Sequence, residues 1–227
     1  MNKNLVLEHL RQHQLNFIHF VDISHLPEDQ NKGYATAILF GTVFSKPYLK
    51  EVTANRNYVA QMKQNNTIKS DEFYLTELKT DGIADKLAQF IRDNGYSSYS
   101  QSEKNVEATG FYNSSTYTTP LPHKTIALQA GLGWIGKHNL LVTEQYGSAI
   151  SMCSVLTNAP LQAIRKEPLK SKCGTCSTCQ QVCLPNAIKG ELWHYGMDRD
   201  DIIAIKKCSP CLQCLVQCPW TQKYINS

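Results

Sequence analysis

Two cysteine runs of identical spacing lie between residues 173 and 218, and they contain eight of the nine cysteines of the chain. In each run three cysteines are separated by two residues, and a fourth follows after three more: Cys173, Cys176, Cys179 and Cys183, then Cys208, Cys211, Cys214 and Cys218. Three thiolates at this spacing can ligate one face of an iron–sulfur cube, whereas the fourth lies too far along the chain to reach the same cube. The runs therefore predict two 4Fe–4S clusters.

The fourth cysteine of each run is expected to ligate the cluster of the other run, as in a bacterial two-cluster ferredoxin. The first cluster is then held by Cys173, Cys176, Cys179 and Cys218. The second cluster is held by Cys208, Cys211, Cys214 and Cys183.

Two other uses of these cysteines were weighed. A disulfide framework needs an oxidising compartment, and the first 20 residues contain no apolar stretch typical of a secretory signal peptide. Two four-cysteine zinc sites are the stronger alternative, but zinc sites usually separate their cysteine pairs by a longer spacer. Ligand-spaced free thiols imply a reducing compartment, so we expect a cytoplasmic protein.

Composition limits the class of protein further. Apolar residues make up 42% of the 227 residues and charged residues 19%, which is typical of a globular chain. No apolar run approaches the roughly 20 residues that span a bilayer, so no membrane partner is expected. The net charge of +4 is a weak argument for nucleic-acid binding.

Residues 1–165 alternate helical and strand patterns, which predicts an α+β protein: a mixed α/β domain followed by a two-cluster domain at 166–227. Apolar side chains at helical spacing predict helices at 4–14, 71–94 and 123–130. Runs of β-branched and aromatic residues predict strands at 16–23, 34–44, 96–102, 140–143 and 148–156. The other predictions are a loop with a short helix at 48–68, a polar loop at 103–119, and a helix at 198–207.

Gly131, Gly133 and Gly136 match the spacing of a dinucleotide-binding fingerprint. That motif requires a strand before it and a helix after it, whereas here the helical pattern precedes the glycines and a strand pattern follows. We therefore exclude a Rossmann interpretation. Glycines still allow a backbone to approach a flat ligand closely, and Trp134 could stack on such a ligand or anchor the core.

Several segments together resemble the epoxyqueuosine reductase family, which is more distantly akin to the reductive dehalogenases. They are residues 120–125, 130–137, 146–148 and 155–161, followed by the two cysteine runs. The resemblance covers roughly residues 115–219. It implies a nitroreductase-like α/β domain that holds a cobalamin, a cluster domain that supplies electrons, and removal of an epoxide oxygen of a modified tRNA base as water.

If a cobalamin or a flavin binds the α/β domain, its candidate contacts are His123, Gly131, Gly133, Trp134, Gly136, Lys137, Tyr146 and Ser148. A reduction that releases water needs protons, and the candidate donors are Asp71, Glu72 and Tyr74. They lie in the segment nearest to the family's catalytic Asp-Tyr-His, which this chain does not reproduce.

The predicted function is an iron–sulfur oxidoreductase that passes electrons from a donor protein to a small molecule or a nucleoside. Full-length family members continue with a helical-repeat domain that helps to hold tRNA, whereas this chain ends eight residues after Pro219. We therefore do not expect tRNA binding. The alternatives are an electron-transfer partner protein without a substrate site, and a zinc-stabilised interaction module.

Overall fold

The computed structural model describes all residues, 1–227, and they form two compact units. The first comprises residues 1–42, 76–131 and 151–167, and the second 43–75, 132–150 and 168–227. Neither unit is continuous in sequence. Parts of residues 43–75 and 132–150 pack against the C-terminal helices of the second unit.

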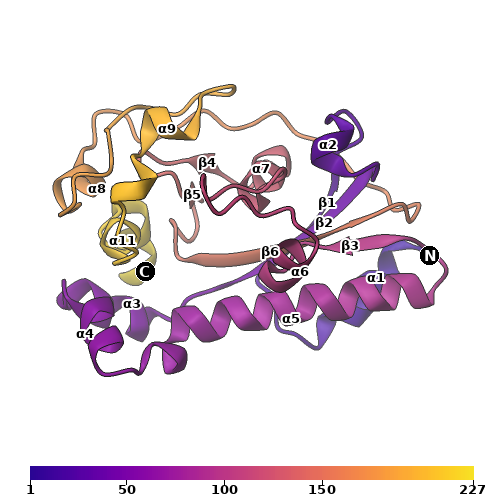
Figure 1. The fold of residues 1–227 in the computed structure, drawn as a ribbon, viewed down its shortest axis with the longest axis horizontal. Coiled ribbons are helices and arrows are strands. Elements are labelled where there is room, and N and C mark those ends of the chain that lie inside the picture. Colours follow the sequence, from indigo (N-terminus) through magenta and orange to yellow (C-terminus); the bar gives the residue numbers. More distant parts are fainter. The chain divides into compact units, whose positions relative to one another are not determined.

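The first unit is a mixed α/β structure built on a four-stranded sheet in the order β1-β2-β6-β3 (Figure 1). The strands are β1 (Phe17–Asp22), β2 (Thr36–Val43), β3 (Ser98–Ser100) and β6 (Ile150–Thr157). The helices are α1 (Lys3–Arg11), α2 (Glu28–Asn31), α5 (Glu72–Asp93), α6 (Glu103–Ala108) and α7 (His123–Gln129). Strands β1 and β2 are antiparallel, with Phe17 opposite Gly41.

One face of the sheet carries the main core. Helix α1 contributes Val6 and Leu10, helix α5 contributes one apolar stripe, and both pack on β2 and β6. The stripe on α5 consists of Ile83, Ala84, Leu87, Ala88 and Ile91. Side chains on the other face of β2 are buried as well, so this strand is covered on both sides.

The second unit is built from short helices, with one two-stranded sheet, β4 (Trp134–Ile135) and β5 (Leu141–Val142). Its helices are α3 (Lys46–Ala54), α4 (Tyr58–Gln64), η1 (Ile68–Ser70), α8 (Thr178–Gln181), α9 (Arg199–Ile202), η2 (Ile205–Lys207), α10 (Gln213–Val216) and α11 (Pro219–Ile225). Apolar residues of α3, α4, α10 and α11 form its largest core. None of the helices in the chain is both long and apolar enough to cross a membrane.

Most predicted elements are found, and three predictions differ from the structure. Residues 48–68, predicted as a loop with one short helix, are mostly taken up by the two helices α3 and α4. The predicted loop at 103–119 begins with helix α6, because Ser102 caps it by accepting a hydrogen bond from the Asn105 amide. The predicted helix at 198–207 is interrupted at Ile203, which is extended and bridges to Ile188. The helix therefore divides into α9 and η2.

Candidate metal centre

The eight cysteines of the two runs all lie in the second unit, on short helices and the turns beside them. Helix α8 carries Cys179, α10 carries Cys214, and α11 begins directly after Cys218. Pro219 occupies the first turn of α11, where its missing N–H costs no helical hydrogen bond. No two of the nine cysteines form a disulfide bond.

Thiols of the first predicted set raise the pKa of their neighbours in the same set. Burial, together with the neighbouring Cys218, Cys173 and Cys176, raises the pKa of Cys179 to about 11. Burial also raises the pKa of Cys218, with Cys173 and Cys176 again among the causes. These four thiols are therefore neighbours, although 39 residues separate Cys179 from Cys218.

The second predicted set shows the same pattern. Burial raises the pKa of Cys208, and Cys183 and Cys211 add to it. Burial raises the pKa of Cys214 strongly, with contributions from Cys211, Cys208, Cys179 and Cys183. Because Cys179 belongs to the first set, the two sets are adjacent.

A metal centre explains why thiols that disfavour each other's ionisation are gathered in this way. Metal ligation requires thiolates, and a bound cation offsets the repulsion between them. The donor set of four thiols fits a 4Fe–4S cluster, whose usual ligands are four cysteines. No group of three or more His, Cys, Asp or Glu side chains is arranged around a position for a single metal ion.

Hydrogen bonds to sulfur support several of these thiols. The Ala187 amide donates to Cys183 Sγ at 3.3 Å. The backbone amides of Trp220 and Thr221, at the start of α11, hydrogen-bond to Cys218 and partly oppose the effect of its burial on the pKa. Hydrogen bonds with the side chain and the backbone of Thr178 lower the pKa of Cys176. Such contacts favour the thiolate form that a metal requires.

Three glutamine side chains tie the cysteine-bearing helices to α3. Gln213 Nε2 donates to the Val52 carbonyl at 3.0 Å, and Gln217 Nε2 donates to the Thr53 carbonyl at 3.3 Å. Gln222 Nε2 donates to Thr53 Oγ1 at 3.3 Å. These bonds hold α10 and α11, and with them Cys214 and Cys218, on a helical support.

The glycine-rich segment is packed against the chain itself. A Cβ on Gly133 would lie 2.0 Å from the Val142 carbonyl oxygen, and one on Gly136 would lie 2.6 Å from the His138 ring. Gly131, at φ +67°, lies against the Lys166 side chain. On the side where a Cβ would stand, the close approach that these glycines permit is therefore made by other residues of the protein.

The other candidate cofactor contacts in the second unit are engaged in the same way. Trp134 is fully buried and meets Trp220 edge to face, with 5.0 Å between the ring centroids. Tyr146 packs edge to face on Tyr224 at 5.5 Å. Ser148 is buried, and its amide donates to Thr221 Oγ1 at 3.0 Å.

Lys137 is also buried, and its positive charge is one of the influences that lower the pKa of Cys176. This places the end of the glycine segment beside the first cysteine set. His138, which the sequence analysis did not single out, is buried next to Lys137 and lies 3.2 Å from Ser148 Oγ through Nε2. No motif identifies His138, because its role depends on the turn that brings residue 148 back to it.

His123 lies in the first unit, at the start of α7. Its Nδ1 is 2.9 Å from Ser154 Oγ, and Ser154 in turn donates to Gln101 Oε1 at 2.7 Å. Because the Ser154 hydroxyl donates its proton to Gln101, Nδ1 of His123 must be the donor to Ser154 Oγ. The Nε2 atom of the neutral ring then carries a lone pair. Burial lowers the pKa of His123 to about 4, so the ring is neutral at pH 7.

The three candidate proton donors lie at the start of α5. Asp71 is buried and accepts hydrogen bonds from the Phe73 amide at 2.9 Å and the Tyr48 hydroxyl at 3.0 Å. Glu72 accepts two hydrogen bonds from Ser45, both at 2.6 Å. Tyr74 is half-buried on the same helix. The two carboxylates therefore have structural partners, and Asp71 Oδ2 alone is buried without one.

A second residue that the sequence analysis missed is Asp81 on α5. Its carboxylate accepts a hydrogen bond from the Glu103 amide at 2.9 Å, and burial raises its pKa. Burial raises the pKa of Cys153 well above its ordinary value, and Asp81 adds to the effect. Cys153 is fully buried in the core, where it packs as a small apolar residue.

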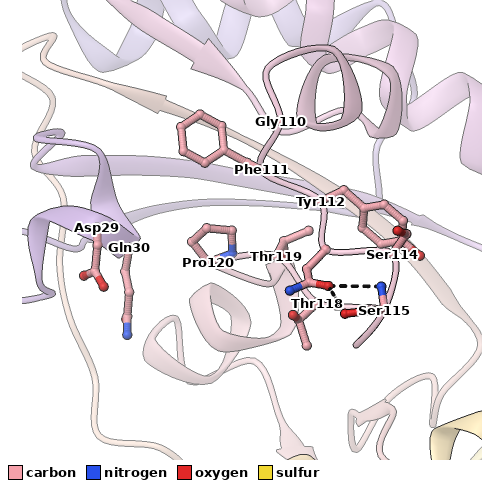
Figure 2. A pocket seen from close by; sticks show the side chains of 11 residues that line it. Asp29, Gln30, Gly110, Phe111, Tyr112, Ser114, Ser115, Thr118, Thr119 and Pro120 are labelled. Atoms are coloured by element: carbon pink, nitrogen blue, oxygen red, sulfur yellow. Dashed lines mark hydrogen bonds between the residues drawn. The ribbon is translucent and has the colours of Figure 1, made fainter.

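A pocket of about 700 Å³ lies in the first unit, between α2 and the segment that follows α6 (Figure 2). It is lined by Asp29, Gln30, Gly110, Phe111, Tyr112, Asn113, Ser114, Ser115, Thr118, Thr119 and Pro120. Asn113 Oδ1 accepts a hydrogen bond from the Ser115 amide at 3.0 Å and shapes the turn. None of the candidate site residues lines this pocket, whose wall combines hydroxyl and amide groups with two aromatic rings.

Comparison with solved structures shows which class of fold this is. A catabolic reductive dehalogenase in complex with 3-bromo-4-hydroxybenzoic acid matches 92% of this chain and 30% of its own, with a TM-score of 0.64 at 17% identity. An epoxyqueuosine reductase with an epoxyqueuosine-modified tRNA-Tyr stem loop matches 97% of this chain and 65% of its own, with a TM-score of 0.57 at 12% identity. A further reductive dehalogenase structure, described as bearing on B12-dependent dehalogenation, gives a TM-score of 0.53 at 16% identity, over 77% of this chain and 23% of its own. The chain has the mixed α/β fold of these reductases.

Sequence comparison narrows the class to a family. The epoxyqueuosine reductase of Synechocystis sp. is 32% identical over 123 residues, which are 47% of this chain and 42% of that protein. The enzyme of Vibrio cholerae is 28% identical over 120 residues, 46% of this chain and 32% of its own length. The chain is similar in sequence to epoxyqueuosine reductases over about half of its length. It spans less than half the length of these curated relatives, and no family model matches it.

Proposed function

We propose that this protein is an iron–sulfur reductase in which two 4Fe–4S clusters pass electrons toward a small-molecule or nucleoside substrate. The observation that carries the proposal is the grouping of the eight cysteines. Each cysteine whose pKa is raised by other thiols has at least two members of its own predicted set among the causes. Cys183 and Cys218 are assigned across the two runs in these sets. The relatives named as reductases support the same class of reaction.

In this proposal Cys173, Cys176, Cys179 and Cys218 hold the first cluster, and Cys183, Cys208, Cys211 and Cys214 hold the second. When bound, each cluster would store and release one electron at a potential set by its surroundings. The amides at the start of α11 and at Ala187 stabilise the thiolates. The glutamine bonds to α3 keep the two sets in fixed positions.

The relatives reduce epoxyqueuosine, as their names state, and loss of an epoxide oxygen as water requires two electrons and two protons. We infer that the substrate of this chain is also reduced with two electrons and two protons. The pocket beside α2 supports a small polar substrate, because its hydroxyl and amide groups can hydrogen-bond and its rings can stack. Asp71, with its unpartnered Oδ2, remains the proposed proton site among Asp71, Glu72 and Tyr74.

A cobalamin or a flavin as a further cofactor does not fit the residues that the sequence assigns to it. Gly131, Gly133, Gly136, Trp134 and Ser148 are occupied by contacts with the chain itself. We therefore derive no step through either group. This observation favours the second candidate function, an electron-transfer partner protein that has no substrate site of its own and receives electrons from a donor protein.

The experiment that tests the proposal is metal analysis of protein purified without oxygen. About eight irons and eight acid-labile sulfides per chain are expected, with the electron paramagnetic resonance (EPR) signals of reduced 4Fe–4S clusters. Colourless protein with two zinc ions per chain would overturn the proposal in favour of a zinc-stabilised module. Gel filtration with cobalamin, FMN and FAD distinguishes an enzyme with a further cofactor from an electron carrier, since only the former retains one of them.

The similarity to epoxyqueuosine reductases indicates which substrates should be assayed. The reduced protein is incubated with epoxyqueuosine as a free nucleoside and, separately, in a tRNA stem loop. Conversion of the nucleoside alone supports a small-molecule reductase, and conversion of both adds tRNA as a partner. Absence of conversion, with full cluster content, supports the electron carrier.

A further inference from the structure

The indole N–H of Trp134 is a buried donor without an acceptor. Trp134 is 0% exposed, and its Nε1 has no hydrogen-bond partner in the protein. An indole nitrogen can only donate, and a buried one normally finds an acceptor because an unpaired donor destabilises the fold. An acceptor that is not part of the polypeptide is therefore expected at this position.

The surroundings of Trp134 are the residues that flank the first cysteine set. The ring of Trp220, two residues after Cys218, lies 5.0 Å away edge to face. Lys172, which directly precedes Cys173, places its Nζ 5.9 Å from the centre of the Trp134 ring. Lys172 is a donor and cannot satisfy the indole, and its ammonium is already paired with Glu144.

The backbone holds Trp134 in this position. Trp134 lies opposite Val142 in the pair β4–β5, and Gly133 is in direct contact with the Val142 carbonyl. A side chain on residue 133 would force the two strands apart. Gly133 thus helps to hold Trp134 beside the residues that flank the first cysteine set.

We propose that Trp134 donates a hydrogen bond from Nε1 to a sulfur atom of the first cluster and raises the reduction potential of that cluster. This inference rests on the proposed function, because it requires a cluster bound by Cys173, Cys176, Cys179 and Cys218. Reduction adds negative charge to the sulfur atoms, so a donor stabilises the reduced state more than the oxidised state. The two clusters would then differ in potential, with the first as the better electron acceptor.

The first test is a redox titration of reconstituted full-length protein, followed by EPR, for wild type and Trp134→Phe. Phenylalanine keeps an aromatic ring and removes the N–H. One midpoint potential is expected to become more negative while the other stays unchanged, at unchanged iron content. Two unchanged midpoints would overturn the inference and leave the proposed function intact. A wild-type protein that binds no iron would overturn both.

The second test examines labelled wild-type protein, so it does not depend on whether Trp134→Phe folds. Wild-type protein is labelled with tryptophan carrying ¹⁵N in the indole ring, and the reduced clusters are examined by pulsed EPR. A ¹⁵N coupling to one cluster is expected, and it should persist in labelled Trp220→Phe and Trp193→Phe. Absence of the coupling in wild type, or its loss in Trp220→Phe, would overturn the assignment to Trp134.

Discussion

The backbone of Gly147 lies directly against Thr221: a Cβ on Gly147 would lie 2.2 Å from the Thr221 amide nitrogen. Gly147 also adopts a positive φ of +59°, which residues with a Cβ rarely adopt. Beside it, the Ser148 amide donates to Thr221 Oγ1 at 3.0 Å. The turn at residue 147 is therefore fitted to the first turn of α11, three residues after Cys218.

Gly147→Ala is expected to destabilise the protein and to weaken the first cluster. The added methyl group meets backbone atoms rather than a flexible side chain, and overpacking of this kind costs about 1–3 kcal/mol. Thermal unfolding followed by circular dichroism should show a lower midpoint. Gly82→Ala on α5 is the matched control, because a Cβ there has nothing within 4 Å and a helix interior favours alanine. Equal midpoints for the two variants would contradict the expectation.

The crossed ligation predicts which cysteine variants resemble one another. Cys218→Ser should lose the same EPR signal as Cys173→Ser, and Cys183→Ser the same signal as Cys208→Ser, because each pair shares a cluster. Each variant should lose about half of the iron. If Cys183→Ser instead matched Cys173→Ser, the ligation would not be crossed. Cys153→Ala, in the apolar core of the first unit, is the control that should keep all the iron.

The elements of the sheet could be predicted because their side chains follow simple periods. Strand β2 is a run of apolar residues and is buried along six of its eight positions. Helix α5 repeats apolar residues at helical spacing and was predicted within one residue at each end. Patterns of this kind depend on local burial alone, so one sequence is sufficient to read them.

The composition of the two units could not be predicted, because it depends on contacts between distant segments. Gln213 bonds to Val52 across 161 residues, and Ser148 bonds to Thr221 across 73. The glycine segment was interpreted as a ligand cradle because glycine permits close approach of any partner. Which partner approaches, here Val142 and His138, is a tertiary property that spacing does not encode.

Asp71→Ala is expected to destabilise the protein by about 2 kcal/mol, because it removes two hydrogen bonds from buried groups. The Phe73 amide would lose its cap, and the Tyr48 hydroxyl would lose its acceptor. Asp71→Asn keeps an acceptor oxygen and should cost less than about 1 kcal/mol in urea unfolding. If Asn were as destabilising as Ala, the negative charge rather than the hydrogen bonds would be responsible.

The same pair of variants tests the proposed proton role. A proton donor at Asp71 predicts that Asp71→Asn loses substrate reduction while its clusters still accept electrons from dithionite. Glu72→Gln is the comparison, since Glu72 is engaged by Ser45 and should affect stability more than turnover. Full activity of Asp71→Asn would remove Asp71 from the mechanism.

The buried ring of His123 is expected to make the folded protein less stable in acid. Its pKa is about 4 in the folded protein, because burial disfavours the charged ring, against 6.5 for the ordinary side chain. The unfolded chain therefore binds more protons between pH 6.5 and 4, so stability falls as the pH is lowered through this window, by at most roughly 3 kcal/mol. Above pH 6.5 the ring is neutral in both states and contributes no pH dependence.

His123→Gln is expected to remove this dependence while keeping a hydrogen-bond partner for Ser154. Unfolding midpoints of wild type and variant, measured from pH 8 to pH 4, should run parallel above pH 6.5 and converge or cross below it. His194→Gln, at an exposed histidine, is the control and should follow the wild-type curve. Parallel curves for wild type and His123→Gln over the whole range would show that the ring of His123 is not held neutral by burial.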